Sequence, residues 1–187
     1  MPVKYKHSNT YSIYFCTFTC YNWIPLFDIT NSYETVYNWF TILKAEKNIE
    51  TVGYVIMPNH VHCILHFPDE HFNLNKLLSN GKRFMAYEIV DRLQQLNRKD
   101  ILAILKSALT EREKRKGQLH KVFKDSFDAK AIFSERFLLQ KLQYIHYNPV
   151  SGKWNLEKHY TLYEHSSASF YEDGTIRHFT PKNFADL

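Results

Sequence analysis

The chain has 187 residues, of which 44% are hydrophobic and 23% charged, a composition typical of a globular protein with one hydrophobic core. Its net charge is +5. No apolar run approaches the roughly 20 residues that cross a membrane, and the N-terminal residues are too polar for a signal peptide. The cysteines, Cys16, Cys20 and Cys63, form no C-x-x-C pair. This excludes a disulfide framework and indicates a reduced, cytoplasmic protein.

Sequence patterns predict strands and helices in alternation along the chain. Runs of β-branched and aromatic residues indicate strands, and apolar residues at helical spacing behind a capping residue indicate helices. In chain order the predicted elements are a strand at 11–20, a helix from 30 or 31 to about 47, strands at 50–57 and 60–67, helices at 73–96 and 101–113, short strands at 122–123 and 131–133, and a helix from 134 to about 147. This order predicts an α+β fold: a ferredoxin-like antiparallel sheet with helices on one face and a helical insert.

We expect residues 1–187 to form a single domain, with a basic helical insert at about 97–121 and a C-terminal tail at about 151–187. Positive charge is concentrated between Gly81 and Lys124, where 12 Lys or Arg stand against five Asp or Glu. Such a segment suits a polyanion such as nucleic acid, although a solvated helix face would give the same count. Within it we expect 112–121 to be a mobile loop or a DNA-facing arm.

Two histidines in the segment Tyr54–Phe67 are candidate metal ligands. Side chains alternate faces along a strand, so His60 and His62 point the same way. Two neighbouring imidazoles can bind one divalent cation, and His66 competes as a third ligand because it shares their face. Histidines at this spacing are also ordinary half-exposed residues of strands, so a metal site requires further ligands from elsewhere in the chain.

The last predicted helix supplies further candidates. Its apolar stripe leaves Lys141, Tyr144 and Asn148 together on one flank, with Tyr147 on the side away from the stripe. If this helix packs beneath the histidine strand, Asn148 could supply a third metal ligand and Tyr144 a nucleophile. In the alternative, Tyr144 is a flank aromatic and Asn148 a C-terminal cap before Pro149, because proline disfavours helical geometry in the preceding residue.

The motifs PNHVH at 58–62 and YIHYNPV at 144–150 resemble those of the HUH (His-hydrophobic-His) single-strand DNA transposases with one catalytic tyrosine. The resemblance is to the REP-associated tyrosine transposases in particular and covers roughly Tyr11 to Tyr171. It implies that His60, His62 and Asn148 bind Mg²⁺ or Mn²⁺ and that Tyr144 is the nucleophile of a 5′-phosphotyrosine intermediate. The resemblance assigns no role to Lys141.

The resemblance further implies a nucleoid-associated enzyme that cleaves and rejoins single-stranded or hairpin DNA. Such enzymes act as monomers or as homodimers that exchange tyrosine helices. Two alternatives stay open: a metal-dependent phosphoesterase that uses water, and a domesticated, non-catalytic hairpin-DNA-binding protein. We expect DNA contacts at basic side chains between 81 and 124, namely Lys82, Arg83, Arg112, Lys114, Arg115 and Lys116.

Overall fold

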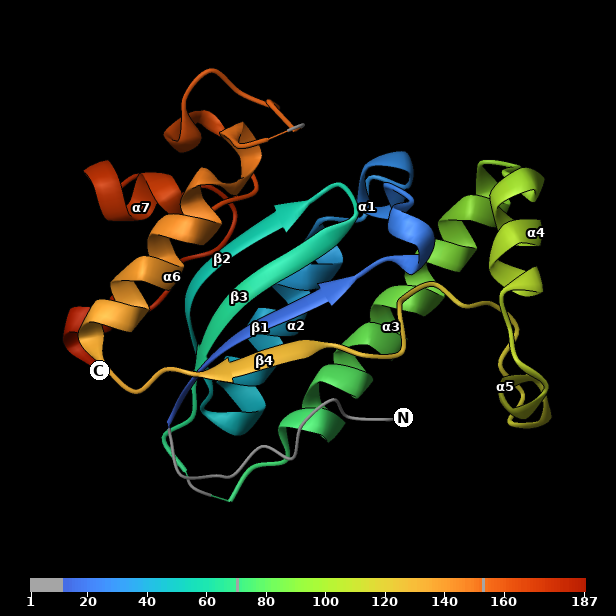
Figure 1. Cartoon of the computed structure of the whole chain (residues 1–187), viewed down its shortest axis with the longest axis horizontal. Coiled ribbons are helices and arrows are strands. Elements are labelled where there is room, and N and C mark those ends of the chain that lie inside the picture. Colours follow the sequence, from blue (N-terminus) through green and yellow to red (C-terminus); the bar gives the residue numbers. More distant parts are fainter. Residues whose placement is uncertain (1–11, 70, 153) are drawn as a thin grey trace.

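The computed structural model describes residues 12–69, 71–152 and 154–187, which form a four-stranded antiparallel sheet flanked by helices (Figure 1). The strand order is β2-β3-β1-β4. The strands are β1 (Ile13–Thr19), β2 (Glu50–Met57), β3 (His60–His66) and β4 (Asp128–Ala131). The α-helices are α1 (Leu26–Ile29), α2 (Glu34–Lys47), α3 (Leu74–Gln95), α4 (Lys99–Ser107), α5 (Glu111–Arg115), α6 (Glu135–Tyr147) and α7 (Ala168–Asp173). Short 3₁₀ helices are η1 (Tyr21–Trp23), η2 (Asn148–Val150), η3 (Tyr160–Leu162) and η4 (Phe184–Asp186).

The predicted α+β, ferredoxin-like fold is confirmed. The predicted strands at 50–57 and 60–67 correspond to β2 and β3, which form a hairpin in which Met57 pairs with His60 across a tight turn. Strand β3 lies between β2 and β1, so it is hydrogen-bonded on both edges. The histidine strand therefore occupies the interior of the sheet, where its backbone is held most firmly.

Helices cover both faces of the sheet, and the histidines point to one of them. Val61 and Leu65 of β3 belong to a core shared with α2 and α3, whereas Ile64 packs with Leu142 and Ile145 of α6 on the other face. The expected helices on one face are α2 and α3, which lie behind the sheet in Figure 1. Helix α6 packs in addition on the opposite face, through Leu142 and Ile145. By alternation, His60 and His62 share the face of Ile64 and lie toward α6.

The helix predicted from 30 or 31 to about 47 corresponds to α2, and its predicted start is wrong. Neither Thr30 nor Asn31 caps α2, which begins at Glu34. The Thr30 hydroxyl instead donates to the Leu26 carbonyl at 2.6 Å and closes the short helix α1. Asn31 adopts a left-handed φ of 46°, which ends the helical path.

The predicted continuous helix at 101–113 is wrong, because the chain forms two helices there. Helix α4 ends at Ser107. Helix α5 begins after Thr110, whose hydroxyl accepts from the Glu113 amide while the Glu113 carboxylate accepts from the Thr110 amide, a capping box. The segment 112–121, expected as a mobile loop or arm, therefore starts inside a helix.

The other helix starts agree with the sequence, and the predicted short strands do so only in part. Asn73 caps α3 and Ser134 caps α6, each accepting a backbone N–H from three residues ahead. The strand predicted at 122–123 is reduced to a single bridge between Cys20 and Phe123. Strand β4 begins at Asp128, earlier than the predicted 131–133.

The C-terminal tail lies along the open edge of β2. The Ile56 amide donates to the His165 carbonyl at 2.8 Å, and the Ser167 amide donates to the Tyr54 carbonyl at 3.0 Å. The tail then forms the short helix α7. Within the part of the chain described, no helix is long and apolar enough to span a membrane.

Candidate active site

His60 and His62 lie side by side on the face of β3 that meets α6. Their ring centroids are 4.7 Å apart and the rings are nearly perpendicular, at 79°. Both residues are buried, with 5% and 6% of their surface exposed. The predicted pairing of the two imidazoles on one face is therefore confirmed.

Asn59 fixes the proton position on His60. The Asn59 amide nitrogen donates to the Trp23 carbonyl at 2.9 Å, so the amide oxygen faces the ring. That oxygen lies 2.7 Å from His60 Nδ1, and because it can only accept, Nδ1 must carry the proton. The Nε2 atom is then the basic nitrogen, the form in which an imidazole binds a metal.

Residues of the neighbouring strand β1 hold the His62 ring in place. Its Nδ1 lies 2.7 Å from the Thr17 hydroxyl, and the two residues are directly paired in the sheet. Its ring stacks on Phe15 at 5.4 Å. Burial lowers the pKa of His62 well below its usual value, and the nearby His60 and Lys141 lower it further. The ring is thus neutral at physiological pH, as a metal ligand must be.

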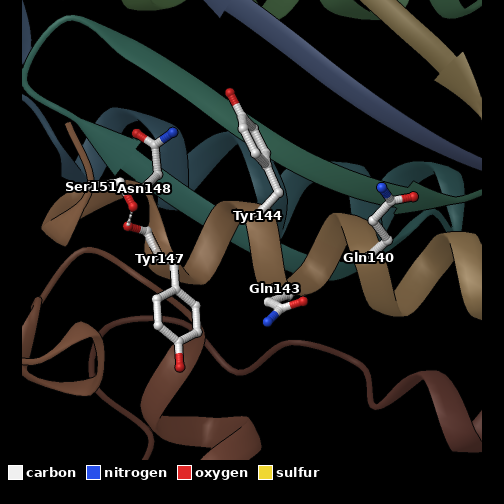
Figure 2. A pocket seen from close by; sticks show the side chains of 6 residues that line it. All are labelled: Gln140, Gln143, Tyr144, Tyr147, Asn148 and Ser151. Atoms are coloured by element: carbon white, nitrogen blue, oxygen red, sulfur yellow. Dashed lines mark hydrogen bonds between the residues drawn. The ribbon is translucent and has the colours of Figure 1, made fainter.

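Helix α6 brings Tyr144 to the histidines within the same chain. The Tyr144 and His62 ring centroids are 5.2 Å apart, and Tyr144 is 48% exposed. Figure 2 shows Tyr144 and Asn148 on one side of α6 and Tyr147 pointing the opposite way. Tyr147 stacks instead on Tyr160, at 4.3 Å between centroids. Tyr144 and the two imidazoles therefore lie together within a single chain.

Asn148 presents an unsatisfied oxygen on the same side of α6. Its backbone stays helical, with φ −54° and ψ −44°, so Pro149 does not displace it from the i+4 position relative to Tyr144. The side-chain Oδ1 is buried and accepts no hydrogen bond from any described residue. Buried oxygens are rarely left without a partner, and a cation is one group that would satisfy it.

The donor types of His60, His62 and Asn148 fit a divalent cation. Two neutral imidazoles and an amide oxygen suit Mn²⁺, and the oxygen also suits Mg²⁺. Among the residues described, no three or more His, Cys, Asp or Glu are grouped so as to hold a metal. His66, four residues beyond His62, therefore does not complete the site, since four residues of strand span roughly 13 Å.

Tight packing between β2 and α6 sets the position of the tyrosine. Gly53 lies at an irregularity in the β2–β3 pairing. A Cβ atom on Gly53 would lie 2.5 Å from Leu142 Cδ2 and 3.2 Å from Ile145 Cδ1. The glycine therefore lets α6 approach the sheet closely enough for Tyr144 to reach His62.

A cationic side chain lies beside the tyrosine. Lys141 Nζ is 4.9 Å from the Phe15 ring centroid and 5.5 Å from that of Tyr144. Burial, followed by the charge of Lys130, lowers the pKa of Lys141. A pocket of about 280 Å³ runs along α6 next to these groups. Its lining is shown in Figure 2 and consists of Gln140, Gln143, Tyr144, Tyr147, Asn148 and Ser151.

The prediction that Lys82 contacts DNA is wrong for this structure. Its side chain is buried, and its Nζ donates to the Lys124 carbonyl at 2.6 Å. Burial lowers its pKa to about 8, opposed by the charge of Asp125. Lys82 therefore anchors the chain segment before β4 rather than a phosphate.

The other basic residues predicted to contact DNA are exposed but lie away from the tyrosine. Arg83, on α3, places its guanidinium 5.1 Å from the Phe84 ring centroid. Lys114 pairs with Glu111 at 2.8 Å. Helix α5 lies at the opposite end of the molecule from α6 (Figure 1). The exposed basic residues on or directly after α5 are Arg112, Lys114, Arg115 and Lys116.

Comparison with known proteins supports the fold. No family model and no curated protein matches the chain. A REP-associated tyrosine transposase, solved bound to a REP hairpin, is 16% identical with a TM-score of 0.60, over 97% of this chain and 93% of that chain. A putative transposase from Deinococcus radiodurans is 14% identical with a TM-score of 0.44, over 76% of this chain and 95% of that chain. The chain thus has the fold of a REP-associated tyrosine transposase.

Proposed function

We propose that this protein is a metal-dependent single-stranded DNA endonuclease and transposase that acts at hairpin sites through Tyr144. One observation carries the proposal: Tyr144 lies against His62 of a paired-histidine site in the same chain, with their ring centroids 5.2 Å apart. The fold of a transposase solved with a REP hairpin supports DNA of that kind as the substrate.

In the proposed reaction the Tyr144 oxygen attacks a DNA phosphorus atom and the 3′ oxygen leaves. The phenol gives up its proton, the departing oxygen takes one up as a 3′-hydroxyl, and the product is a 5′-phosphotyrosine. Since this link keeps the phosphodiester bond, a 3′-hydroxyl of another strand can attack it and release Tyr144. His60, His62 and Asn148 would hold Mg²⁺ or Mn²⁺, which when bound offsets the charge developing on the phosphate.

Two neighbours of Tyr144 assist this chemistry. The ammonium group of Lys141 lies 5.5 Å from the phenol ring centroid, where a positive charge attracts the incoming phosphate. Phe15 contacts both Tyr144 and His62, at 6.0 and 5.4 Å between centroids. It therefore fixes their relative orientation, and an attack in line with the leaving oxygen depends on that orientation.

A covalent-adduct assay tests the proposal. A 3′-labelled hairpin with unpaired flanks, incubated with Mn²⁺, should yield a labelled protein band with the wild-type protein. Tyr144→Phe and His60→Ala should abolish the band. Tyr147→Phe is the matched control, because Tyr147 lies one turn away on the other side of α6, and it should retain the adduct (Figure 2).

The same assay separates the two alternatives. Cleavage without an adduct, unchanged in Tyr144→Phe, would show a phosphoesterase that uses water. Hairpin binding without cleavage, unchanged in His60→Ala, would show a non-catalytic binding protein. Either result would overturn the proposed mechanism.

A further inference from the structure

The indole of Trp23 lies next to the histidine pair but takes no part in the chemistry described above. Its ring centroid is 5.8 Å from that of His60, in an edge-to-face arrangement of 78°. Half of its surface, 50%, is exposed. Half of the indole surface is therefore available for contact with a ligand.

The backbone that presents Trp23 adopts an unfavourable conformation. Asn22 and Trp23 have φ values of 51° and 59°, a left-handed region that bulky residues rarely enter. Such a conformation costs about 1–3 kcal/mol per residue and persists only where surrounding contacts impose it. Here the Tyr21 amide donates to the Val122 carbonyl at 2.7 Å and Asn59 donates to the Trp23 carbonyl. The turn is thus held so that the indole stays exposed beside His60.

A lysine accompanies the indole. Lys124 Nζ lies 4.3 Å from the Trp23 ring centroid. The Lys124 backbone is fixed on both sides, since its amide donates to the Thr19 carbonyl at 2.9 Å and its carbonyl accepts from Lys82 at 2.6 Å. The buried Lys82 thereby holds Lys124 over Trp23, so that an exposed aromatic surface and a positive charge lie together next to His60.

We propose that Trp23 and Lys124 form a subsite for one unpaired nucleotide adjacent to the cleaved phosphate. The base stacks on the exposed part of the indole, and Lys124 pairs with the nucleotide's phosphate. Aromatic side chains and cations together bind single strands in this way, whereas a paired base stays within its own helix. The location of the subsite rests on the proposed function, because it places the cleaved phosphate at His60, His62 and Tyr144.

Binding measurements without turnover test the subsite. In a Tyr144→Phe background with EDTA, the affinity for a fluorescent hairpin with unpaired flanks is compared with that for a blunt hairpin. Trp23→Ala should weaken binding of the flanked hairpin roughly 5- to 100-fold, the effect of one lost stacking contact. Binding of the blunt hairpin should stay unchanged. Trp23→Phe should retain most of the affinity for the flanked hairpin. Lys124→Gln should lose part of this affinity, and the affinity that remains should depend less on salt concentration.

Tyr87→Ala is the matched control, since Tyr87 is an exposed aromatic, at 64%, on α3 beneath the other face of the sheet. It should bind the flanked hairpin like the parent. Mn²⁺ titration should show equal affinity in Trp23→Ala and wild type. The subsite would be overturned if Trp23→Ala bound the flanked hairpin as tightly as the parent. It would also be overturned if Trp23→Ala lost Mn²⁺ affinity together with DNA affinity.

The proposed function fails by a different result. If the wild-type protein forms no adduct but Trp23→Ala still loses affinity for unpaired flanks, the subsite stands and the covalent mechanism falls. If the adduct forms and Trp23→Ala binds flanked DNA like the parent, the mechanism stands and the subsite falls.

Discussion

Asn59 illustrates how one buried side chain can determine the chemistry of its neighbour. Only 2% of the residue is exposed, and its amide spans the Trp23 carbonyl and His60 Nδ1 at 2.9 and 2.7 Å. The amide cannot be reversed without placing its N–H₂ group against the His60 ring and its oxygen against a carbonyl. Asn59 is therefore a positioning residue for the proposed metal site.

Substitutions at Asn59 should separate its two hydrogen bonds. Asn59→Ala removes the acceptor that fixes the His60 proton, and we expect Mn²⁺ affinity to fall roughly 10- to 100-fold. Asn59→Asp keeps an acceptor for His60 Nδ1, so its Mn²⁺ affinity should stay within a few-fold of wild type. It loses the hydrogen bond to the Trp23 carbonyl, so its free energy of unfolding should fall. Isothermal titration gives the affinities and urea unfolding the stabilities. Equal Mn²⁺ affinity in the two variants would contradict the role assigned to the acceptor.

The candidate site was only partly predictable residue by residue. Strand alternation placed His60 and His62 on one face, and the four-residue spacing placed Tyr144 beside Asn148. Thr17 could not be found in this way, because its contact with His62 depends on the register between β1 and β3. The buried state of Lys82 likewise depends on a carbonyl more than 40 residues away in the sequence.

At the scale of elements, the approach of α6 to β2 determines whether Tyr144 reaches the histidines. Gly53→Ala would place a Cβ atom 2.5 Å from Leu142 Cδ2, so the Leu142 side chain or the helix that carries it must shift. We expect a loss of about 1–3 kcal/mol in unfolding free energy and slower adduct formation.

A double-mutant cycle tests whether Gly53→Ala destabilises the protein through its contact with Leu142. Leu142→Ala destabilises by leaving a cavity but removes the clash, so the two substitutions together should be less destabilising than the sum of their separate effects. Urea unfolding measures the coupling. Additive effects would show that Gly53 does not act through Leu142.

Element boundaries were predictable where a local hydrogen bond defines them. The side chains of Asn73 and Ser134 cap α3 and α6 as the sequence indicated. The break between α4 and α5 also had a local signal, because Thr110 and Glu113 form the T-x-x-E pattern of a capping box. By contrast, the face on which α6 packs depends on Gly53 and on the whole sheet, and no local pattern encodes it.

The whole molecule should lose stability in acid because it buries neutral histidines. Burial lowers the pKa of His146 to about 4. Burial also lowers the pKa of His165 to about 4. The charges of Glu164 and Asp28 oppose this lowering, and that of His178 adds to it. Between pH 6.5 and about 4 the unfolded chain therefore binds protons that the native protein does not, so stability falls as pH falls. At about 1.4 kcal/mol per pH unit, His146 alone lowers the free energy of unfolding by ~3 kcal/mol between pH 6.5 and about 4.

Urea unfolding at a series of pH values between roughly 7.5 and 4.5 measures this loss. His146→Gln combined with His165→Gln should flatten the pH dependence, whereas His159→Gln, on the surface, should leave it as in wild type. An unchanged slope in the double variant would assign the acid sensitivity to other groups.

The basic residues of α5 are separated from the proposed active site. The basic helix α5 and the tyrosine helix α6 lie at opposite ends of the fold (Figure 1), so a hairpin bound by both must extend across the molecule. If α5 contacts DNA phosphates, Arg112→Gln with Arg115→Gln should reduce the slope of log affinity against log salt by roughly 1–2, about 0.7–0.9 per lost phosphate contact. The rate of adduct formation at saturating DNA should not change, because no reacting group is altered.

Lys47→Gln with Lys76→Gln, an equal loss of exposed charge on α2 and α3, is the control and should leave the slope unchanged. Equal slopes for the α5 variant and the control would exclude α5 from the DNA-binding surface and direct the search to the region around Trp23 and Lys124.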